Sequence, residues 1–280
     1  MAGTLGTDTL AAFNPTIWRK DTILARQHKL VLAQAIDRFD KDVLTMGKAI
    51  QVPRHALQTA RTKAAGVAIT YDANSEGNLT ININTQAYHA FIVDDIEEAQ
   101  ANQDIMQIYT DGAGYAIAKK VDDDLFTTAY ASPANTVGTA SSLVRIATTF
   151  LTGANQYLDL ADAPDEDRFF TVDAYGYKQM MDLDSFVRYD ATGQSAILNG
   201  RVGTAYGFEI LKTNNQVSTT LQSKSVAFHK SFLALAMQRE EVIKNEYSVD
   251  YIGTKVVAYN IYGNAVARSD HGVVVFYGVG

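Results

Sequence analysis

Apolar and polar residues alternate in two segments of the chain, residues 66–72 and 78–84. Both segments are rich in β-branched residues, and the stretch between them has the composition of a turn. Leu79, Ile81 and Ile83 should share one face of the second strand, with hydroxyl and amide side chains on the other face. The pattern predicts a long β-hairpin. Because a two-stranded ribbon buries too little surface to be stable alone in water, this hairpin should lie on another surface.

A helical period follows the hairpin. Apolar residues recur at spacings of three and four between residues 105 and 125, which places them on one stripe of a helix. Asp94 or Asp95 can cap this helix, and acidic residues fill its first turn, where the helix dipole favours negative charge. The predicted helix therefore runs from Asp94 or Asp95 to about Leu125. At about 1.5 Å per residue it is roughly 45 Å long, which exceeds the diameter of a small domain.

No lysine or arginine occurs between Lys63 and Lys119. The charged residues of this stretch are all acidic: Asp72, Glu76, Asp94, Asp95, Glu97, Glu98, Asp104 and Asp111. Their neutralising charge must come from other parts of the fold, from solvent ions or from another chain. A small basic patch of Arg54, Arg61 and Lys63 precedes the gap.

The remaining predicted elements mix strands and helices. Thr22–Met46 should be partly helical after a polar N-terminal arm, and Ser141 or Ser142 should cap a second helix that ends near Phe150. A further helix is predicted for residues 174–183, and strands are predicted for residues 47–53, 168–173, 197–203, 206–212, part of 225–237, 256–261 and 272–277. The regular βαβ alternation of a doubly wound sheet is absent, so the predicted fold class is α+β.

Composition excludes several classes of protein. The chain has 280 residues, of which 47% are apolar, and this is enough for one or two domains with real cores. Its net charge of −7 argues against a generic nucleic-acid-binding role, although an acidic protein can enclose DNA without adhering to it. The absence of cysteine excludes disulfides, thiolate metal sites and cysteine nucleophiles. Without a membrane-length apolar run or a signal peptide, we expect a soluble protein made in a cytoplasm.

The search for catalytic chemistry finds no constellation, so we predict no catalytic residue, cofactor or metal and expect no enzyme activity. The five histidines lack metal-ligand spacing, and neither a nucleophile elbow nor a phosphate-binding loop is present. The acidic cluster at residues 159–167 lacks the glycine and glutamate of a calcium loop and should be a solvated loop. Asp122–Asp124 lies at the predicted end of the long helix, where acids oppose the helix dipole. A partner's arginine or a bound cation could neutralise it, or it could face solvent.

The order of segments carries a family resemblance. Besides the long hairpin, the segments that carry it are Phe13–Trp18, Gly47–Pro53, Val93–Glu97, Ala116–Asp122, Ala163–Arg168, Leu198–Phe208, Asn214–Asn215, Ala227–Lys230 and Tyr262–Gly263. Together they resemble a tailed-bacteriophage major capsid protein of the Hong Kong ninety-seven type fold. The resemblance covers nearly the whole chain.

This resemblance implies a division of the chain into five parts. They are an N-terminal arm and helix that reaches over a neighbour (1–46), a strand and the extended E-loop hairpin that lies on the adjacent subunit (47–92), the spine helix of the peripheral domain with the following loop (93–140), the axial domain (141–224) and a return to the peripheral and axial sheets (225–280). The predicted inter-subunit contact residues are Trp18, Arg54, Arg61, Lys63, Asn74, Glu76, Asp94, Asp95, Glu97 and Glu98. We expect Arg54, Arg61 or Lys63 to face an acid of the spine helix on a neighbouring chain.

The resemblance also implies partners and a location. Copies of the chain would form the pentamers and hexamers of an icosahedral head in the virion, assembled in the host cytoplasm around double-stranded DNA. Portal and scaffolding proteins are implied, a decoration or cement protein is an open question, DNA contact should be weak and non-specific, and no membrane is involved. The short arm predicts a separate scaffolding protein. Because the predicted hairpin tip has no lysine, we expect no lysine–asparagine cross-link.

Two other functions remain open on the sequence alone. A cellular nanocompartment shell could use the same fold, and it would form a small closed particle around an enzyme. An unrecognised α+β enzyme would need a pocket with converging titratable groups.

Overall fold

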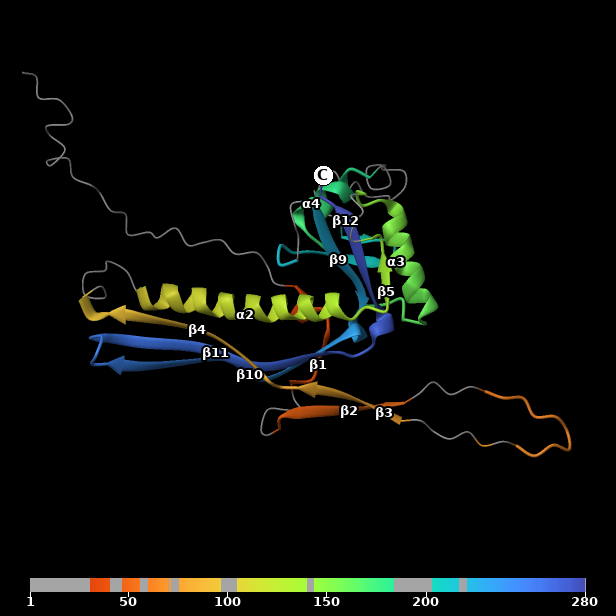
Figure 1. Ribbon diagram of the computed structural model, residues 1–280, viewed down its shortest axis with the longest axis horizontal. Coiled ribbons are helices and arrows are strands. Elements are labelled where there is room, and N and C mark those ends of the chain that lie inside the picture. The colour runs from red at the N-terminus through yellow and green to blue at the C-terminus, as the bar shows by residue number, and fades with distance from the viewer. Residues whose placement is uncertain are drawn as a thin grey trace, which may run out of the picture.

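Two larger β-sheets, one separate hairpin and three α-helices form the part of the chain that the computed structural model describes (Figure 1). The described residues are 31–40, 47–55, 60–69, 71, 76–96, 105–139, 144–183, 203–216 and 221–279. In chain order the elements are η2 (Leu32–Gln34), β1 (Asp37–Arg38), β2 (Ala49–His55), β3 (Glu76–Asn82), β4 (Thr85–Asp94), α2 (Ile105–Ala131), β5 (Asn135–Val137), α3 (Thr148–Leu160), β6 (Arg168–Val172), α4 (Ala174–Met181), β7 (Thr204–Ala205), β8 (Phe208–Lys212), β9 (Gln222–His229), η4 (Lys230–Phe232), β10 (Leu233–Ser248), β11 (Gly253–Val266), η5 (Ser269–His271) and β12 (Gly272–Gly278).

The first sheet forms an elongated layer along α2. Its strand order is β1-β10-β11-β4, with β1 parallel to β10 and the other pairs antiparallel. Figure 1 shows α2 following the length of β4, β10 and β11. The buried side chains of α2 include Ala113, Ile117, Val121, Leu125 and Ala129, four residues apart, so the helix packs one stripe on the sheet.

The second sheet, of order β5-β12-β9-β6-β8-β7, forms a rounded lobe with α3 and α4. Its core combines apolar residues of the strands with Leu151, Leu158 and Met180 of the two helices. Inside it, the carboxylate of Asp173 accepts hydrogen bonds from the Gly176 amide and from the Ser223 and Tyr277 hydroxyls, each at 2.7 Å. One buried acid therefore caps α4 and ties it to β9 and β12.

An apolar junction joins the two sheets, α2 and the segment before β1. We define it by Leu32, Ile36, Leu125, Phe126, Val226, Phe228, Phe232, Leu233, Leu235, Tyr262 and Val274. At its centre, Phe232 belongs to η4, which connects β9 of the second sheet to β10 of the first. Gly272 lies so close to the Phe232 ring that a Cβ there would be 2.3 Å from it. The junction therefore fixes where the chain crosses between the sheets.

The hairpin of β2 and β3 projects beyond the first sheet (Figure 1). Its base packs through Ile81 and Ile83 on Ala234 and Ala236 of β10. As predicted, Leu79, Ile81 and Ile83 are more buried than the polar residues between them. The hairpin therefore lies on another surface only at its base.

The partner of β3 differs from the prediction. Residues 66–69 and 71, part of the predicted first arm, are not in a strand, and β2 pairs with β3 instead. This register places Ile50 opposite Ile81 and Val52 opposite Leu79. Apolar cross-strand pairs on the packed face stabilise the β2–β3 pairing, and alternation alone does not supply a partner.

The predicted helix boundaries are confirmed in part. The predicted start at Asp94 or Asp95 is confirmed, because Asp95 and Ile96 are helical and the Asp94 carboxylate accepts from the Ile96 amide, although Asp94 also ends strand β4, which the sequence analysis did not predict. Helix α2 continues past Leu125 to Ala131. The second helix begins at Thr148, because Ala147 is extended, and it ends at Leu160. Of the predicted segment Thr22–Met46, residues 31–40 contain a short 3-10 helix and strand β1, and the rest lies outside the described residues.

Other expectations are confirmed. Strand β6, helix α4 and strands β11 and β12 lie where predicted, and the α+β class holds. The predicted strand at residues 197–203 lies outside the described residues except for Gly203, and β8 pairs with the short strand β7. Within the described ranges, no helix is long and apolar enough to cross a membrane.

Gly263→Ala should separate the hairpin base from β11. A Cβ at this position would lie 2.1 Å from the Asn82 carbonyl oxygen. We expect the free energy of unfolding, measured in urea, to fall by about 1 to 3 kcal/mol, as for other overpacked sites. Gly112→Ala is the matched control, because nothing lies within 4 Å of its Cβ position on the exposed side of α2. It should stabilise the chain by up to about 1 kcal/mol, and equal effects of both variants would contradict the expected contact.

Candidate assembly interface

The connection between β2 and β3 exposes large apolar side chains. Residues 60–69 and 71 are all exposed, and among them Val67, Ile69 and Tyr71 stand out, with 85% of Tyr71 accessible. A ribbon of this kind cannot bury such residues within its own chain. The tip of the hairpin is therefore suited to contact with another molecule.

A second apolar surface lies at the far end of the first sheet, around the turn from β10 to β11. This distal tip consists of Ile92, Ile96, Ile243, Tyr247, Val249, Tyr251 and Ile252, all exposed. Ile252 has a φ of +45°, a costly conformation for a β-branched residue. Its carbonyl oxygen accepts a hydrogen bond from the Asp95 amide at 3.1 Å. The turn is thus held in a strained shape that presents apolar side chains to solvent.

Asp94 and Asp95 hold this tip together within one chain. Asp94 Oδ1 accepts from the Ile96 amide, and Asp95 Oδ2 accepts from the Tyr247 hydroxyl, both at 2.9 Å. Between residues that the structure describes, no lysine or arginine forms an ion pair with an acid of residues 64–118. Asp94 and Asp95 therefore bind an amide and a hydroxyl of the tip.

The predicted contact residues lie at separate places. Arg54 is in β2 and Glu76 begins β3, while Arg61 and Lys63 are in the exposed connection between these strands. Figure 1 shows this connection at the right and the end of β4, with Asp94, at the opposite end of the molecule. Glu76 lies opposite His55 and so next to Arg54 in the paired strands, whereas Asp94 lies far from both. Trp18, Asn74, Glu97 and Glu98 lie outside the described residues.

Asp122 anchors the segment that leads out of the N-terminal region. It lies inside α2, is 1% exposed, and accepts hydrogen bonds from the Val31 amide at 3.3 Å and the Ala33 amide at 3.1 Å. These amides open η2, whose first turn has no side-chain cap of its own. Burial raises the pKa of Asp122, and the hydrogen bonds from the backbone partly oppose this effect.

Both sequence-based alternatives are therefore wrong for Asp122, which is neither neutralised by a cation nor exposed to solvent. Peptide amides of its own chain, distant in sequence, provide the positive dipoles that face it. The segment after η2 continues this attachment, because β1 pairs with β10 and the Phe39 amide donates to the Leu235 carbonyl at 2.9 Å. Residues 31–39 are thus fixed to both α2 and the first sheet.

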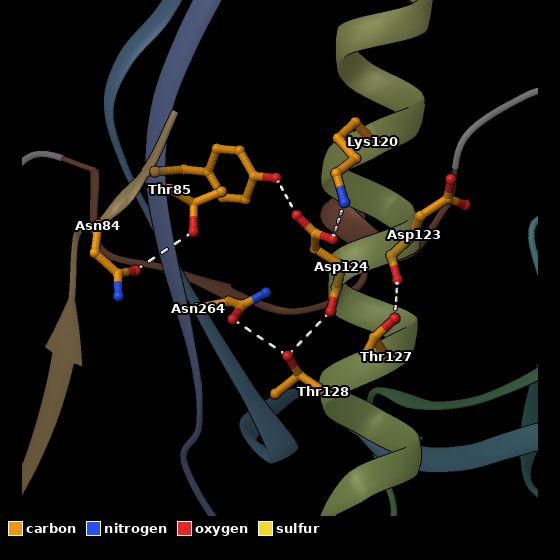
Figure 2. A network of polar contacts seen from close by, with 9 residues as sticks. Asn84, Thr85, Lys120, Asp123, Asp124, Thr127, Thr128 and Asn264 are labelled. Atoms are coloured by element: carbon orange, nitrogen blue, oxygen red, sulfur yellow. Dashed lines mark hydrogen bonds and ion pairs between the residues drawn. The ribbon is translucent and has the colours of Figure 1, made fainter. Parts of the chain in front are cut away.

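Asp124 joins α2 to β11 (Figure 2). Its carboxylate accepts from Lys120 and from the Tyr262 hydroxyl, each at 2.5 Å. One turn further along α2, the Thr128 hydroxyl donates to Asn264 at 3.2 Å. Burial and the neighbouring carboxylate raise the pKa of Tyr262, so its hydroxyl remains a donor.

The acidic cluster at residues 159–167 surrounds a buried cation that the sequence analysis missed. Arg168 pairs with Asp159 at 2.7 Å and with Asp165 at 3.0 Å, and it donates to the carbonyls of Ala163 and Pro164. The cluster is therefore not a purely solvated loop. An arginine that opens an apolar strand directly after several acids was the available signal. In the described parts of the chain, no group of three or more metal-ligating residues could hold a metal ion.

Comparison with known proteins places these features in a family. The model of a family described as phage capsid protein matches residues 27–277. A structure from Mycobacterium phage Che8 is similar with a TM-score of 0.82 and 23% identity, covering 94% of this chain and 97% of that one. The capsid of cyanophage P-SCSP1u gives 0.80 and 19%, covering 97% and 95%, and that of Helicobacter pylori bacteriophage KHP30 gives 0.80 and 9%, covering 100% of both. No curated protein matches the chain.

Asp122→Ala should release the segment around η2. We expect a loss of about 1 to 3 kcal/mol in the free energy of unfolding, because the amides of a buried turn lose their acceptor. Limited proteolysis should also cut near residues 31–36 sooner. Asp122→Asn keeps one acceptor oxygen and should be intermediate. Asp123→Ala, one position along and less buried, is the control, and equal stability of Asp122→Ala and Asp123→Ala would show that Asp122 is not an anchor.

Proposed function

As a member of the phage capsid protein family, this chain is a major capsid protein that forms a phage head, and we propose that its copies do so as pentamers and hexamers of an icosahedral shell around double-stranded DNA. The observation that supports this most directly is the projecting β2–β3 hairpin, whose tip exposes Val67, Ile69 and Tyr71. Such a ribbon gains a stable environment when an adjacent subunit covers it. The family match favours this function over a nanocompartment shell or an enzyme.

The sheet topology supports a division into functional parts. We assign the four-stranded sheet and α2 to a peripheral domain, and the six-stranded sheet with α3 and α4 to an axial domain whose loops gather at the capsomer centre. Residues 1–46 act as the arm and residues 47–92 contain the E-loop. The chain after residue 224 contributes to both sheets, as expected for a segment that returns to both domains.

The proposed ion pairs join the hairpin of one chain to the acidic end of the first sheet of another chain, because these two places lie far apart on a single chain. Arg54, Arg61 and Lys63 belong to the hairpin, and Asp94 and Asp95 belong to the opposite end of the first sheet (Figure 1). Copies that lie side by side could bring the hairpin of one subunit to the acids of the next. The acidic stretch gains its neutralising charge in this way.

Further partners follow from the role in the head. Assembly takes place in the host cytoplasm with a portal and a separate scaffolding protein, and the head can carry a decoration protein. The net charge of −7 suits weak, non-specific contact with the packaged DNA. Assembly needs no lysine–asparagine cross-link, catalytic residue or membrane.

Arg61→Glu should weaken assembly and reduce its salt dependence. If each contact loses about 1 kcal/mol, the protein concentration needed for shell formation rises about fivefold. Light scattering and negative-stain electron microscopy across a salt series measure this. Glu97→Arg or Glu98→Arg in the same chain should restore assembly where the reversed pair meets across subunits. Unchanged assembly and salt dependence in Arg61→Glu would rule out the pairing.

Ile252→Gly should separate folding from assembly at the distal tip. Glycine adopts positive φ freely, so the unassembled chain should gain about 1 kcal/mol of stability. Loss of an exposed apolar side chain should at the same time weaken assembly. Tyr206→Gly is the matched control, since Tyr206 also has a positive φ, of 50°, but lies in the turn between β7 and β8. Normal assembly of Ile252→Gly would show that this side chain makes no contact between subunits.

A further inference from the structure

The chain passes between the two sheets at two adjacent crossings. η4 connects β9 to β10, and η5 connects β11 to β12. The crossings are bonded to each other, because the Phe232 carbonyl accepts from the Ala267 amide at 2.8 Å and from the Arg268 amide at 3.2 Å. A change at these crossings therefore alters how one sheet is held relative to the other.

Two histidines and a serine link the crossings through their side chains. Ser231 Oγ, in η4, lies 2.8 Å from His229 Nδ1 and 2.7 Å from His271 Nδ1, in η5. The two imidazole rings meet edge to face with centroids 5.6 Å apart. Neither the arm anchor nor the proposed subunit contacts use these three residues.

The protonation state of His229 is set by the backbone. The Ser231 amide donates to His229 Nδ1 at 3.2 Å, and this bond caps η4. Nδ1 must therefore be unprotonated, so neutral His229 carries its proton on Nε2. A second proton can bind only at Nδ1, where it replaces an acceptor with a donor. Protonation of His229 thus removes the cap of η4, because the new Nδ1–H of His229 then faces the N–H of Ser231.

The charges around the pair act in both directions. Asp37 of β1 and Asp167 before β6 face His229, Asp270 faces His271, and these acids favour protonation. Arg168 opposes protonation of both histidines, Arg268 opposes that of His271, and His271 opposes that of His229. Burial is the largest influence and lowers the pKa of both histidines.

We propose that His229, Ser231 and His271 form a pH-sensitive latch, which is closed when His229 is neutral and is released when mild acid protonates His229 Nδ1. Release loosens the two crossings and so the attachment between the sheets. This goes beyond the capsid function, because it concerns the conformation of a single chain and does not depend on assembly.

The direction of the effect follows from linkage. Because the pKa of His229 is lower in the folded chain than its ordinary value near 6.5, the unfolded chain binds more protons as the pH falls below about 6.5. The contribution of the latch to stability is complete above that pH. It is lost progressively as the pH falls toward the pKa of the folded state.

Hydrogen–deuterium exchange of the full chain tests the latch, with rates corrected for the intrinsic effect of pH. Between about pH 7.5 and pH 5.5, the range in which histidines titrate, peptides covering 229–232 and 267–271 should lose about tenfold in protection. His229→Asn keeps an acceptor for the Ser231 amide but cannot titrate in this range, so its loss of protection should be clearly smaller than that of the wild type, with only His271 left to titrate. His89→Asn, at an exposed position of β4, is the control and should respond like the wild type.

A second variant separates a titrating latch from a purely structural cap. His271 lowers the pKa of His229 through their mutual repulsion, so His271→Asn should move the midpoint of the exchange response to higher pH. The proposal is overturned if the wild type shows no loss of protection, if His229→Asn shows the same loss, or if the midpoint of His271→Asn does not move. None of these outcomes depends on shell formation, so the latch and the capsid function are tested separately.

Discussion

Burial of the apolar junction around Phe232 is the constraint on which the rest of the structure depends. Residues of both sheets, of α2 and of the segment before β1 meet there, so no one of these elements can be placed without the others. Gly272 is required at this point because the Phe232 ring leaves no space for a Cβ. The elongated first sheet can then extend from the junction in one direction, and the rounded lobe in another (Figure 1).

Carboxylates add polar contacts to the apolar packing where the long helix meets its neighbours. Asp122 and Asp124 lie two residues apart in α2, and each joins the helix to a different element. Asp122 satisfies the free amides of η2, and Asp124 holds the hydroxyl of Tyr262. Asp173 has the same role in the second sheet. Buried acids fix orientation in this way because an unpaired partner would be costly.

The periphery has the opposite character. The hairpin tip and the distal tip expose apolar side chains, and Ile252 is held in a strained conformation at one of them. A chain that stayed monomeric would gain nothing from these features. Burial of these surfaces against neighbouring copies is part of the proposed assembly. Because both surfaces belong to the layer that extends from the junction, the junction determines where they lie relative to the rounded lobe.

Local periodicity let the sequence alone determine the α+β class, the position of β6, α4, β11 and β12, and the apolar face of β3. The family resemblance, carried by the order of short segments, also determined the capsid function. Only the tertiary structure decided which strand pairs with β3 and which groups face Asp122. It also decided that Arg168 is buried beside Asp159, and that Ser231 links His229 to His271. The physical reason is that periodicity describes one element at a time. Asp122 and the amides that it binds are 89 and 91 residues apart, and nothing in their local sequences records that contact.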